Sequence, residues 1–148
     1  MTTIDELVDF ALNNPDNLYS KIDIGCISDE LAQNIKEFTN FELHNYLISI
    51  DSYAILHTLN HHGIEETENL RGQEGITKQD FSLLLDIVFY ADKISDAGKG
   101  KDGKDAILFE KTIDNLYHAV FEIRTIIGEK KKLYKQSRII LKTYYKHK

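Results

Sequence analysis

The sequence predicts an α+β fold in which N-terminal helices pack on a C-terminal antiparallel β-sheet, a three-stranded meander. Two observations support this prediction. Most segments before residue 93 repeat their apolar residues at helical spacing, whereas three segments after residue 105 have strand character and are joined by short links. Helices followed by strands are typical of α+β domains. One face of such a sheet packs on the helices, and the other can stay open to hold a ligand.

The first 50 residues are expected to combine two short helices with a small pair of strands. Residues 3–14 have apolar side chains at helical spacing before Asn-Asn-Pro, which predicts a helix. The alternating segment KIDIGCI (21–27) predicts a strand. Ser28 is placed to cap a helix over 28–38 with an acidic first turn, and FELHNYLISI (41–50) predicts the second strand.

The middle of the chain is expected to hold two further helices separated by a polar loop. Asp51 or Ser52 caps the first, which stops at Gly63. The second covers residues 77–92 and has a stripe of apolar residues typical of a core-facing helix. The segment DAGKGKDGKD (96–105) predicts a turn, because it lacks the GK[ST] ending and the preceding apolar strand of a phosphate loop.

The meander is predicted over residues 106–113, 116–127 and 133–145, with hairpin links at 114–115 and 128–130. If the last strand alternates regularly, one of its faces carries Lys135, Ser137, Ile139, Leu141, Thr143 and Tyr145.

Composition indicates an ordinary globular protein. The chain has 148 residues, of which 42% are hydrophobic and 28% charged, so one domain can bury a core. Cys26 is the only cysteine, which excludes an intramolecular disulfide and a cysteine-based zinc site. The acidic N-terminus does not resemble a signal peptide, and no apolar stretch is long enough to cross a bilayer. These features predict a cytoplasmic protein without a membrane partner.

The C-terminal segment is basic although the whole chain is acidic. Residues 128–148 hold eight Lys and Arg against Glu129, a net charge of +7; since the whole chain has −6, the remainder carries −13. Such asymmetry indicates a local surface for anions. Aromatic residues lie among these cations, a mixture suited to phosphates and bases, namely Tyr134, Tyr144 and Tyr145.

The segment LHTLNHHG (56–63) contains three histidines, which suggest metal ligands, an acid–base pair or a polar helix end. His57 and His61 have the spacing of the H-E-x-x-H motif, but the glutamate is missing and no third ligand is evident, so neither metal nor cofactor is predicted. His57 and His62 could exchange protons with a phosphodiester. They lie roughly 140° apart on a regular helix, however. Spacing alone favours the third alternative, in which histidines lie at the C-terminal end of the helix, where a positive charge interacts favourably with the helix dipole.

The run from residue 21 to the C-terminus resembles the phage-associated Barnase–EndoU–ColicinE5/D–RelE-like nuclease domains. The matching features, in order, are IDIGCISDELAQNI, the pattern of His, four residues and His-Gly in HTLNHHG, RGQ followed by ITKQDF, ADKI, FEK, a strand carrying Glu122, and LKTYYK. The resemblance implies a nuclease-like domain over 21–148, with residues 1–20 as an N-terminal helical extension. It also implies helices packed on an antiparallel sheet.

The resemblance further implies a metal-independent endoribonuclease whose partner is RNA. His57 would be general base or acid and His62 its candidate partner. Lys111 and Arg71 would neutralise charge on the phosphorane, and Thr143 would bind a phosphate oxygen. On the last strand Tyr145 would stack on a base or orient the phosphate, and the neighbouring Lys142 is a further substrate-binding candidate.

A non-enzymatic alternative remains open. The domain would then be an inactive nuclease-like module that binds RNA or a host protein, such as a phage-encoded inhibitor. The charge of −13 outside the C-terminal segment favours this alternative, because surrounding negative charge weakens phosphate binding. An immunity or antitoxin protein as a second partner is also left open.

Overall fold

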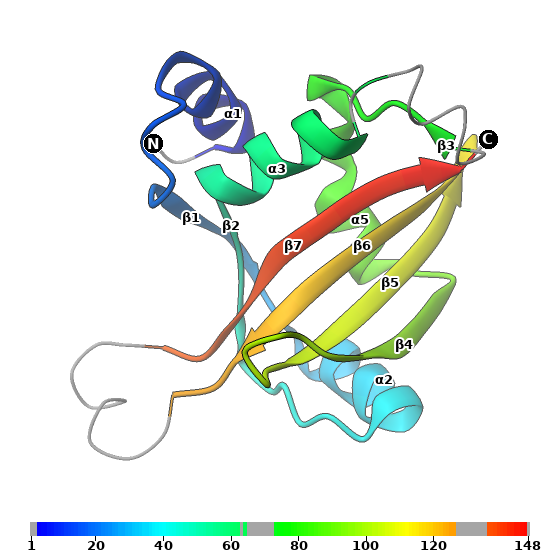
Figure 1. The fold of residues 1–148 in the computed structure, drawn as a ribbon. Coiled ribbons are helices and arrows are strands. Elements are labelled where there is room, and N and C mark those ends of the chain that lie inside the picture. The colour runs from blue at the N-terminus through cyan, green and yellow to red at the C-terminus, as the bar shows by residue number, and fades with distance from the viewer. Residues whose placement is uncertain (1–2, 63, 65–72, 127–135, 148) are drawn as a thin grey trace.

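The computed structural model describes residues 3–62, 64, 73–126 and 136–147. One sheet runs through the molecule in the strand order β1-β2-β7-β6-β5-β4, and β3 pairs with the end of β7 (Figure 1). The elements in chain order are α1 (Ile4–Asn13), β1 (Lys21–Cys26), α2 (Asp29–Thr39), β2 (Leu47–Asp51), α3 (Ser52–His62), β3 (Gln73–Glu74), the 3₁₀ helix η1 (Lys78–Leu83), α5 (Leu84–Phe89), β4 (Lys93–Lys99), β5 (Asp105–Ile113), β6 (Asn115–Arg124) and β7 (Arg138–His147).

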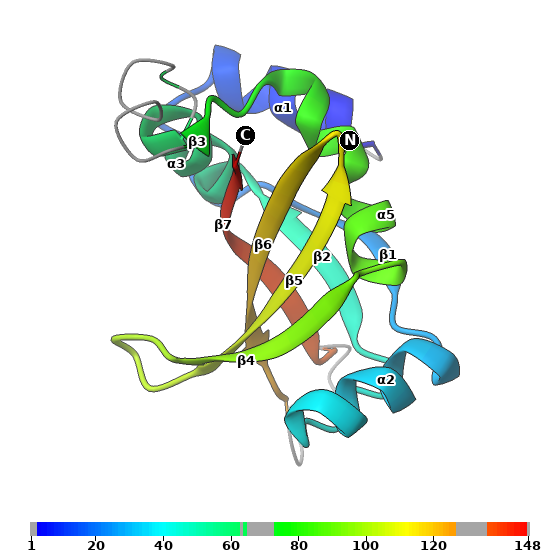
Figure 2. The same cartoon turned by 90° about the vertical axis from the view of Figure 1, so that its right-hand side faces the viewer.

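The two faces of the sheet have different surroundings. Helices α2 and α5 lie on one side of it, whereas α3 lies on the other side, next to the upper part of β7 (Figure 2). The first side, called here the core face, carries fully buried side chains of β5, β6 and β7: Ile107, Phe109, Ala119, Phe121, Leu141 and Tyr144. The second side, called the open face, carries Leu108, Glu110, His118, Val120, Glu122, Thr143 and Tyr145, as the strand register requires.

The predicted α+β class is confirmed, but the sheet is larger than a three-stranded meander. The expected strand pair near the N-terminus, β1 and β2, joins the same sheet, because β2 pairs in parallel with β7. A further strand, β4, was missed because its second half falls in the segment predicted as a turn. A bulge between Asp96 and Gly98, with Gly98 at φ +84°, lets this glycine-containing segment remain in the sheet.

Several boundaries also differ from the prediction. The strand expected from residue 41 begins at Leu47, two residues after Asn45, whose φ is positive. The helix expected over 77–92 consists of η1 followed by the short α5. The last strand is described from Arg138, while the predicted hairpin link at 128–130 lies outside the described residues.

A second bulge changes the predicted faces of β7. Thr143 is opposite Val120, but Leu141 is opposite Phe121, so one extra residue, Lys142, stands between these two pairs. Leu141 therefore turns into the core while Thr143 lies on the open face. The prediction that both residues share a face was wrong, because regular alternation does not continue through a bulge.

Helix α3 follows β2 without a loop and packs beside β7. The Asp51 carboxylate accepts a hydrogen bond from the Ala54 backbone N–H at 2.8 Å, so Asp51 is the predicted helix cap. Buried Ala54, Ile55 and Thr58 face the rest of the molecule. Gly63, predicted to end this helix, is outside the described residues. No helix in the described ranges has the length and apolar character needed to span a membrane.

Candidate active site

Helix α3 presents its histidines in two directions. The His57 ring lies between Tyr53 and His61, with ring centroids 5.7 and 4.5 Å away, as residues one turn apart on a helix should. His62 instead turns toward the sheet, where its ring is 5.5 Å from that of Tyr145 on β7. The two predicted catalytic histidines thus diverge on the helix, but His62 reaches the open face.

Tyr145 is part of a ring cluster on the open face. Its ring stacks on His118 of β6, with centroids 4.6 Å apart, and the ring of His147 is 4.9 Å from that of His118. Burial is the main factor that raises the pKa of the Tyr145 hydroxyl, and the Glu110 carboxylate raises it further. Tyr145 is therefore a neutral aromatic surface at the end of β7.

His118 was not among the predicted site residues, although it is one of the few buried polar side chains. Its Nδ1 is 3.5 Å from Glu110 Oε2, without hydrogen-bond geometry, and neither ring nitrogen has a hydrogen-bond partner among the described residues. Burial lowers the pKa of His118, and Glu110 opposes this effect. The alternation of side chains along the predicted strand could have identified His118 as a site residue, because it places His118 on the same face as Glu122.

The pKa of His57 is lowered, which favours the neutral imidazole. Partial burial lowers its pKa, and His61, His62 and Lys142 lower it further because their positive charges oppose another cation nearby. An imidazole that is neutral at pH 7 can accept a proton, which is the requirement for a general base.

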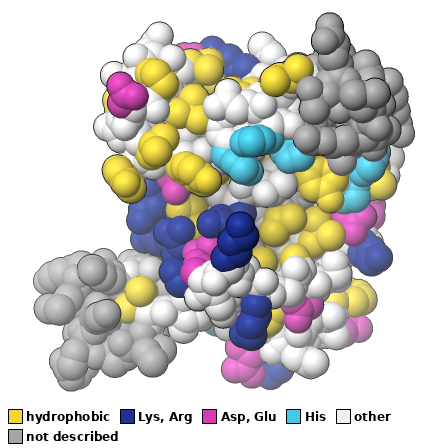
Figure 3. Space-filling model, in the orientation of Figure 1, with side chains coloured by type: hydrophobic (Ala, Val, Ile, Leu, Met, Phe, Trp, Pro, Cys, Tyr) yellow, Lys and Arg dark blue, Asp and Glu magenta, His cyan; other side chains and the backbone are white. Residues whose placement is uncertain are grey.

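Lys142 and Thr143 stand together at the bulge of β7. The Lys142 ammonium is 3.0 Å from Glu122 Oε2, so its side chain lies on the open face like that of Thr143. Figure 3 shows histidines gathered on this side of the molecule, with a patch of Lys and Arg side chains next to them. The open face near α3 therefore combines proton-transfer groups, an aromatic ring, a hydroxyl and a cation.

Of the other two predicted site residues, one lies on the core face and the other lies outside the described residues. Lys111 is opposite Tyr117 in the sheet and belongs to the core face. Its ammonium donates a hydrogen bond to the Tyr90 carbonyl at 2.9 Å and lies 3.7 Å from Asp92 Oδ1. Arg71 lies outside the described residues.

Behind the open face, Asp80 ties η1 to β6 and β7. Its carboxylate accepts hydrogen bonds from the Tyr117 hydroxyl at 2.6 Å and the Lys146 ammonium at 2.9 Å, and its backbone carbonyl accepts one from the Tyr144 hydroxyl at 2.7 Å. Tyr144 and Lys146 flank Tyr145, so these bonds on the core face hold the strand that presents Tyr145 on the open face.

Burial of Asp80 would raise its pKa, but hydrogen bonds from Tyr117, Thr77 and Lys146 outweigh burial and lower it. Asp80 is therefore a carboxylate at neutral pH, and the buried Lys146 ammonium has a counter-charge. The same carboxylate raises the pKa of the Tyr117 hydroxyl, although burial contributes more.

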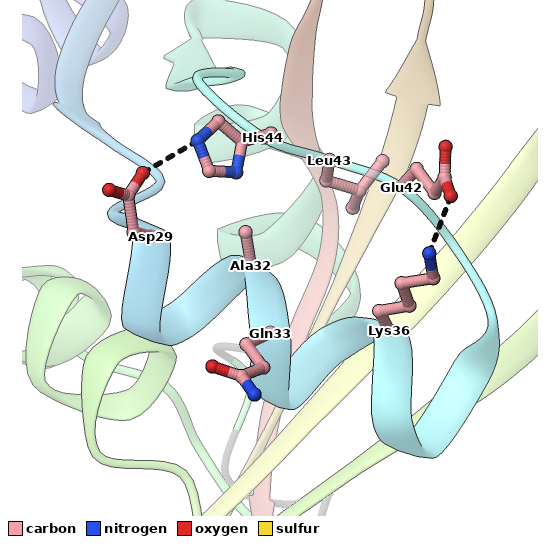
Figure 4. A pocket seen from close by; sticks show the side chains of 7 residues that line it. All are labelled: Asp29, Ala32, Gln33, Lys36, Glu42, Leu43 and His44. Atoms are coloured by element: carbon pink, nitrogen blue, oxygen red, sulfur yellow. Dashed lines mark hydrogen bonds and ion pairs between the residues drawn. The ribbon is translucent and has the colours of Figure 1, made fainter.

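A separate hollow of about 470 Å³ lies between α2 and residues 42–44 (Figure 4). Two exposed ion pairs flank it, Lys36 with Glu42 at 2.7 Å and His44 with Asp29 at 2.6 Å. None of the predicted site residues that fall within the described ranges lines this hollow. Exposed ion pairs are common surface features that contribute little, so we place the candidate active site on the open face instead.

The geometry contains no evident metal centre within the described part of the chain, since no three His, Cys, Asp or Glu side chains there are grouped to hold an ion. Comparison with known protein families matches residues 25–148 to the family described as phage-Barnase-EndoU-ColicinE5/D-RelE like nuclease3. No curated protein and no solved structure matches the chain.

Proposed function

Because this chain belongs to the phage-Barnase-EndoU-ColicinE5/D-RelE like nuclease3 family, we propose that it is a metal-independent endoribonuclease. The observation that supports this proposal best is the meeting of α3 and β7, where His62 lies against Tyr145 and the half-buried His57 is influenced by Lys142. Proton-transfer groups and a cation beside an aromatic ring suit a nucleic-acid substrate.

The proposed reaction needs two proton transfers at one phosphodiester, so the phosphate must lie between His57 and His62, which diverge on α3. His57, neutral at pH 7, takes the proton of the ribose 2′-hydroxyl as the 2′-oxygen attacks phosphorus. The bond from phosphorus to the 5′-oxygen breaks, and His62 protonates that oxygen. The products are a 2′,3′-cyclic phosphate and a 5′-hydroxyl end.

The remaining residues hold the substrate. Thr143 donates a hydrogen bond to an oxygen of the scissile phosphate, and Lys142 attracts the adjoining part of the phosphate backbone. Tyr145, whose ring packs on His118 and His62, orients the phosphate through its hydroxyl. Lys111 has no role in this mechanism, because its side chain lies on the core face. Arg71 remains a candidate from the sequence alone.

The direct test is incubation of the purified protein with RNA in excess EDTA, followed by analysis of the new ends. We expect cleavage with 2′,3′-cyclic phosphate and 5′-hydroxyl ends. If the RNA stays intact even at high protein concentration, the alternative of an inactive binding module gains support. Cleavage that EDTA abolishes would contradict the metal-independent mechanism.

The pH dependence of cleavage tests the role of His57 as base. Because a base must be unprotonated and the pKa of His57 is lowered, we expect kcat/KM to rise with pH along an acid limb whose midpoint lies below about 6.5. At higher pH kcat/KM should fall again, because the general acid must be protonated. His61→Ala removes a neighbouring positive charge and should move this midpoint to higher pH. Melting curves over the same range are needed, since depressed histidine pKa values also make the fold less stable as the pH falls through them. A midpoint that His61→Ala leaves unchanged would argue against His57 as the titrating group.

Thr143→Val tests the proposed hydrogen bond to phosphate. Valine is nearly isosteric and suits a strand, so the melting temperature should stay within about 2 °C of wild type, as expected for a change of up to about 0.5 kcal/mol. Cleavage should fall about tenfold, because one hydrogen bond to a charged group contributes roughly 1.5 kcal/mol. Full activity with an unchanged melt would mean that Thr143 is an ordinary strand residue.

A further inference from the structure

Three cations surround one buried carboxylate on the open face. Glu122 Oε1 accepts a hydrogen bond from Arg124 Nε at 2.8 Å and lies 3.7 Å from the Lys104 ammonium, while Oε2 lies 3.0 Å from Lys142. The Glu122 side chain is 5% exposed, but those of Lys104, Arg124 and Lys142 are 49, 36 and 43% exposed. These three residues, called here the cation cluster, thus contact the buried Glu122 carboxylate while remaining accessible to solvent.

The charge of this region is not balanced. One carboxylate contacts all three cations, and Asp102 Oδ2 lies 3.9 Å from the Lys104 ammonium. At the adjoining strand ends, Asp23 pairs with Arg138 at 3.3 Å, and Asp51 caps α3. Burial lowers the pKa of Lys21 there, and repulsion from Arg138 and Arg124 lowers it further, against the opposing effect of Asp23 and Asp51. The region therefore has an excess of positive charge that a bound anion would relieve.

Glu122 also reduces the cost of binding such an anion. Lysine and arginine side chains lose rotamer entropy when a ligand immobilises them. Here the buried carboxylate already restricts three of them in the free protein. Beside the cluster is a hollow of about 210 Å³, lined by Gly98, Ala106 and Val120 together with Lys104 and Lys142.

We propose that the cation cluster binds the RNA phosphate next to the one that is cleaved. Lys142 directly precedes Thr143, and Glu122 is two residues along β6 from Val120, which stands opposite Thr143. Two strand residues span about 7 Å, comparable with one nucleotide of an extended single strand. The hollow beside the cluster accommodates the ribose or base of the same nucleotide. This inference rests on the proposed function, because Thr143 defines where the scissile phosphate lies.

Binding of a strand that cannot be cleaved tests this site separately from catalysis. The probe is a fluorescent single-stranded 2′-deoxy oligonucleotide of mixed sequence, titrated at several salt concentrations against wild type, Lys104→Gln and Arg124→Gln. Lys36→Gln is the matched control, since it makes the same charge change on α2, outside the cluster. We expect the control to bind like wild type. Each cluster variant should bind several-fold more weakly, with the slope of log K against log salt reduced by about 0.7.

The outcomes separate the two proposals. The phosphate site would be overturned if wild type and both cluster variants had equal affinity and salt slope, or if Lys36→Gln weakened binding as much as the cluster variants do. It would also be overturned if wild type did not bind the oligonucleotide, the result expected if the true occupant is an acidic protein. A normal binding pattern combined with intact RNA in the cleavage assay would retain the phosphate site and refute the ribonuclease.

For an active enzyme, the site also predicts a dependence on substrate length. Lys104→Gln should lower kcat/KM for a long RNA but leave cleavage of a dinucleotide unchanged, because a dinucleotide has only the scissile phosphate. An equal loss on both substrates would place Lys104 at the reaction centre and contradict a neighbouring subsite.

Discussion

His57→Ala is expected to lower the rate of RNA cleavage by about 100- to 10,000-fold, the usual contribution of a general acid or base. Without the imidazole, only water can take the proton of the 2′-hydroxyl. Alanine favours a helix, and the side chain of His57 is only partly buried, so α3 should persist. The measurement is a single-turnover cleavage rate beside a thermal melt.

His61→Ala is the matched control for this prediction. His61 lies one turn further along α3 and is more exposed than His57, and its ring centroid lies 4.5 Å from that of His57. Its removal should shift the pH profile but leave the maximal rate within about threefold of wild type. Comparable losses in both variants, or full activity in His57→Ala, would remove His57 from the proposed mechanism.

The sequence identified the histidine helix because its signals are local. Asp51 caps α3 as predicted, and the spacing of His57, His61 and His62 fixes their directions on a regular helix. What spacing could not reveal is that α3 packs beside β7, so that His62 meets Tyr145. That contact depends on the parallel pairing of β2 with β7, between strands far apart in the chain.

The position of Lys111 depends on the length of one hairpin. The predicted two-residue link at 114–115 would pair Lys111 with His118 on the open face. In the structure Ile113 pairs with Asn115 around Asp114 alone, at φ 60°, so His118 is opposite Glu110 and Lys111 turns to the core face. A shift of one residue exchanges the faces of a strand. Composition did not specify the link length, because Asp and Asn both tolerate a positive φ.

The residues around Glu122 could not be grouped from the sequence, for a different reason. Charge counting located the excess of cations in residues 128–148, but the cation cluster takes only Lys142 from that segment. Lys104 comes from the Gly-rich turn, and Arg124 and Glu122 from β6. Strand pairing, rather than proximity in sequence, brings these charges together, and the bulge at Lys142 turns this side chain toward Glu122.

The second large effect concerns stability. Asp80→Asn should lower the free energy of unfolding by about 3–5 kcal/mol, because it leaves the buried Lys146 ammonium without its counter-charge. For a domain of this size the melting temperature should fall by about 6–20 °C. The hydrogen bonds from Tyr117 and Thr77 would also be weakened or rearranged around the amide. Thermal and urea unfolding at neutral pH measure the change.

The pH dependence and a double variant distinguish this mechanism from a simple packing defect. Because the pKa of Asp80 is lowered, its stabilisation is present above the unfolded-state pKa and is lost as the pH falls through the folded-state pKa. The difference between wild type and Asp80→Asn should therefore shrink in acid. Lys146→Met, added to Asp80→Asn, removes the unpaired buried charge and should recover part of the lost stability. If the double variant is less stable than Asp80→Asn alone, the ion pair is not the reason for the loss, and η1 holds β6 and β7 mainly through the tyrosine hydroxyls.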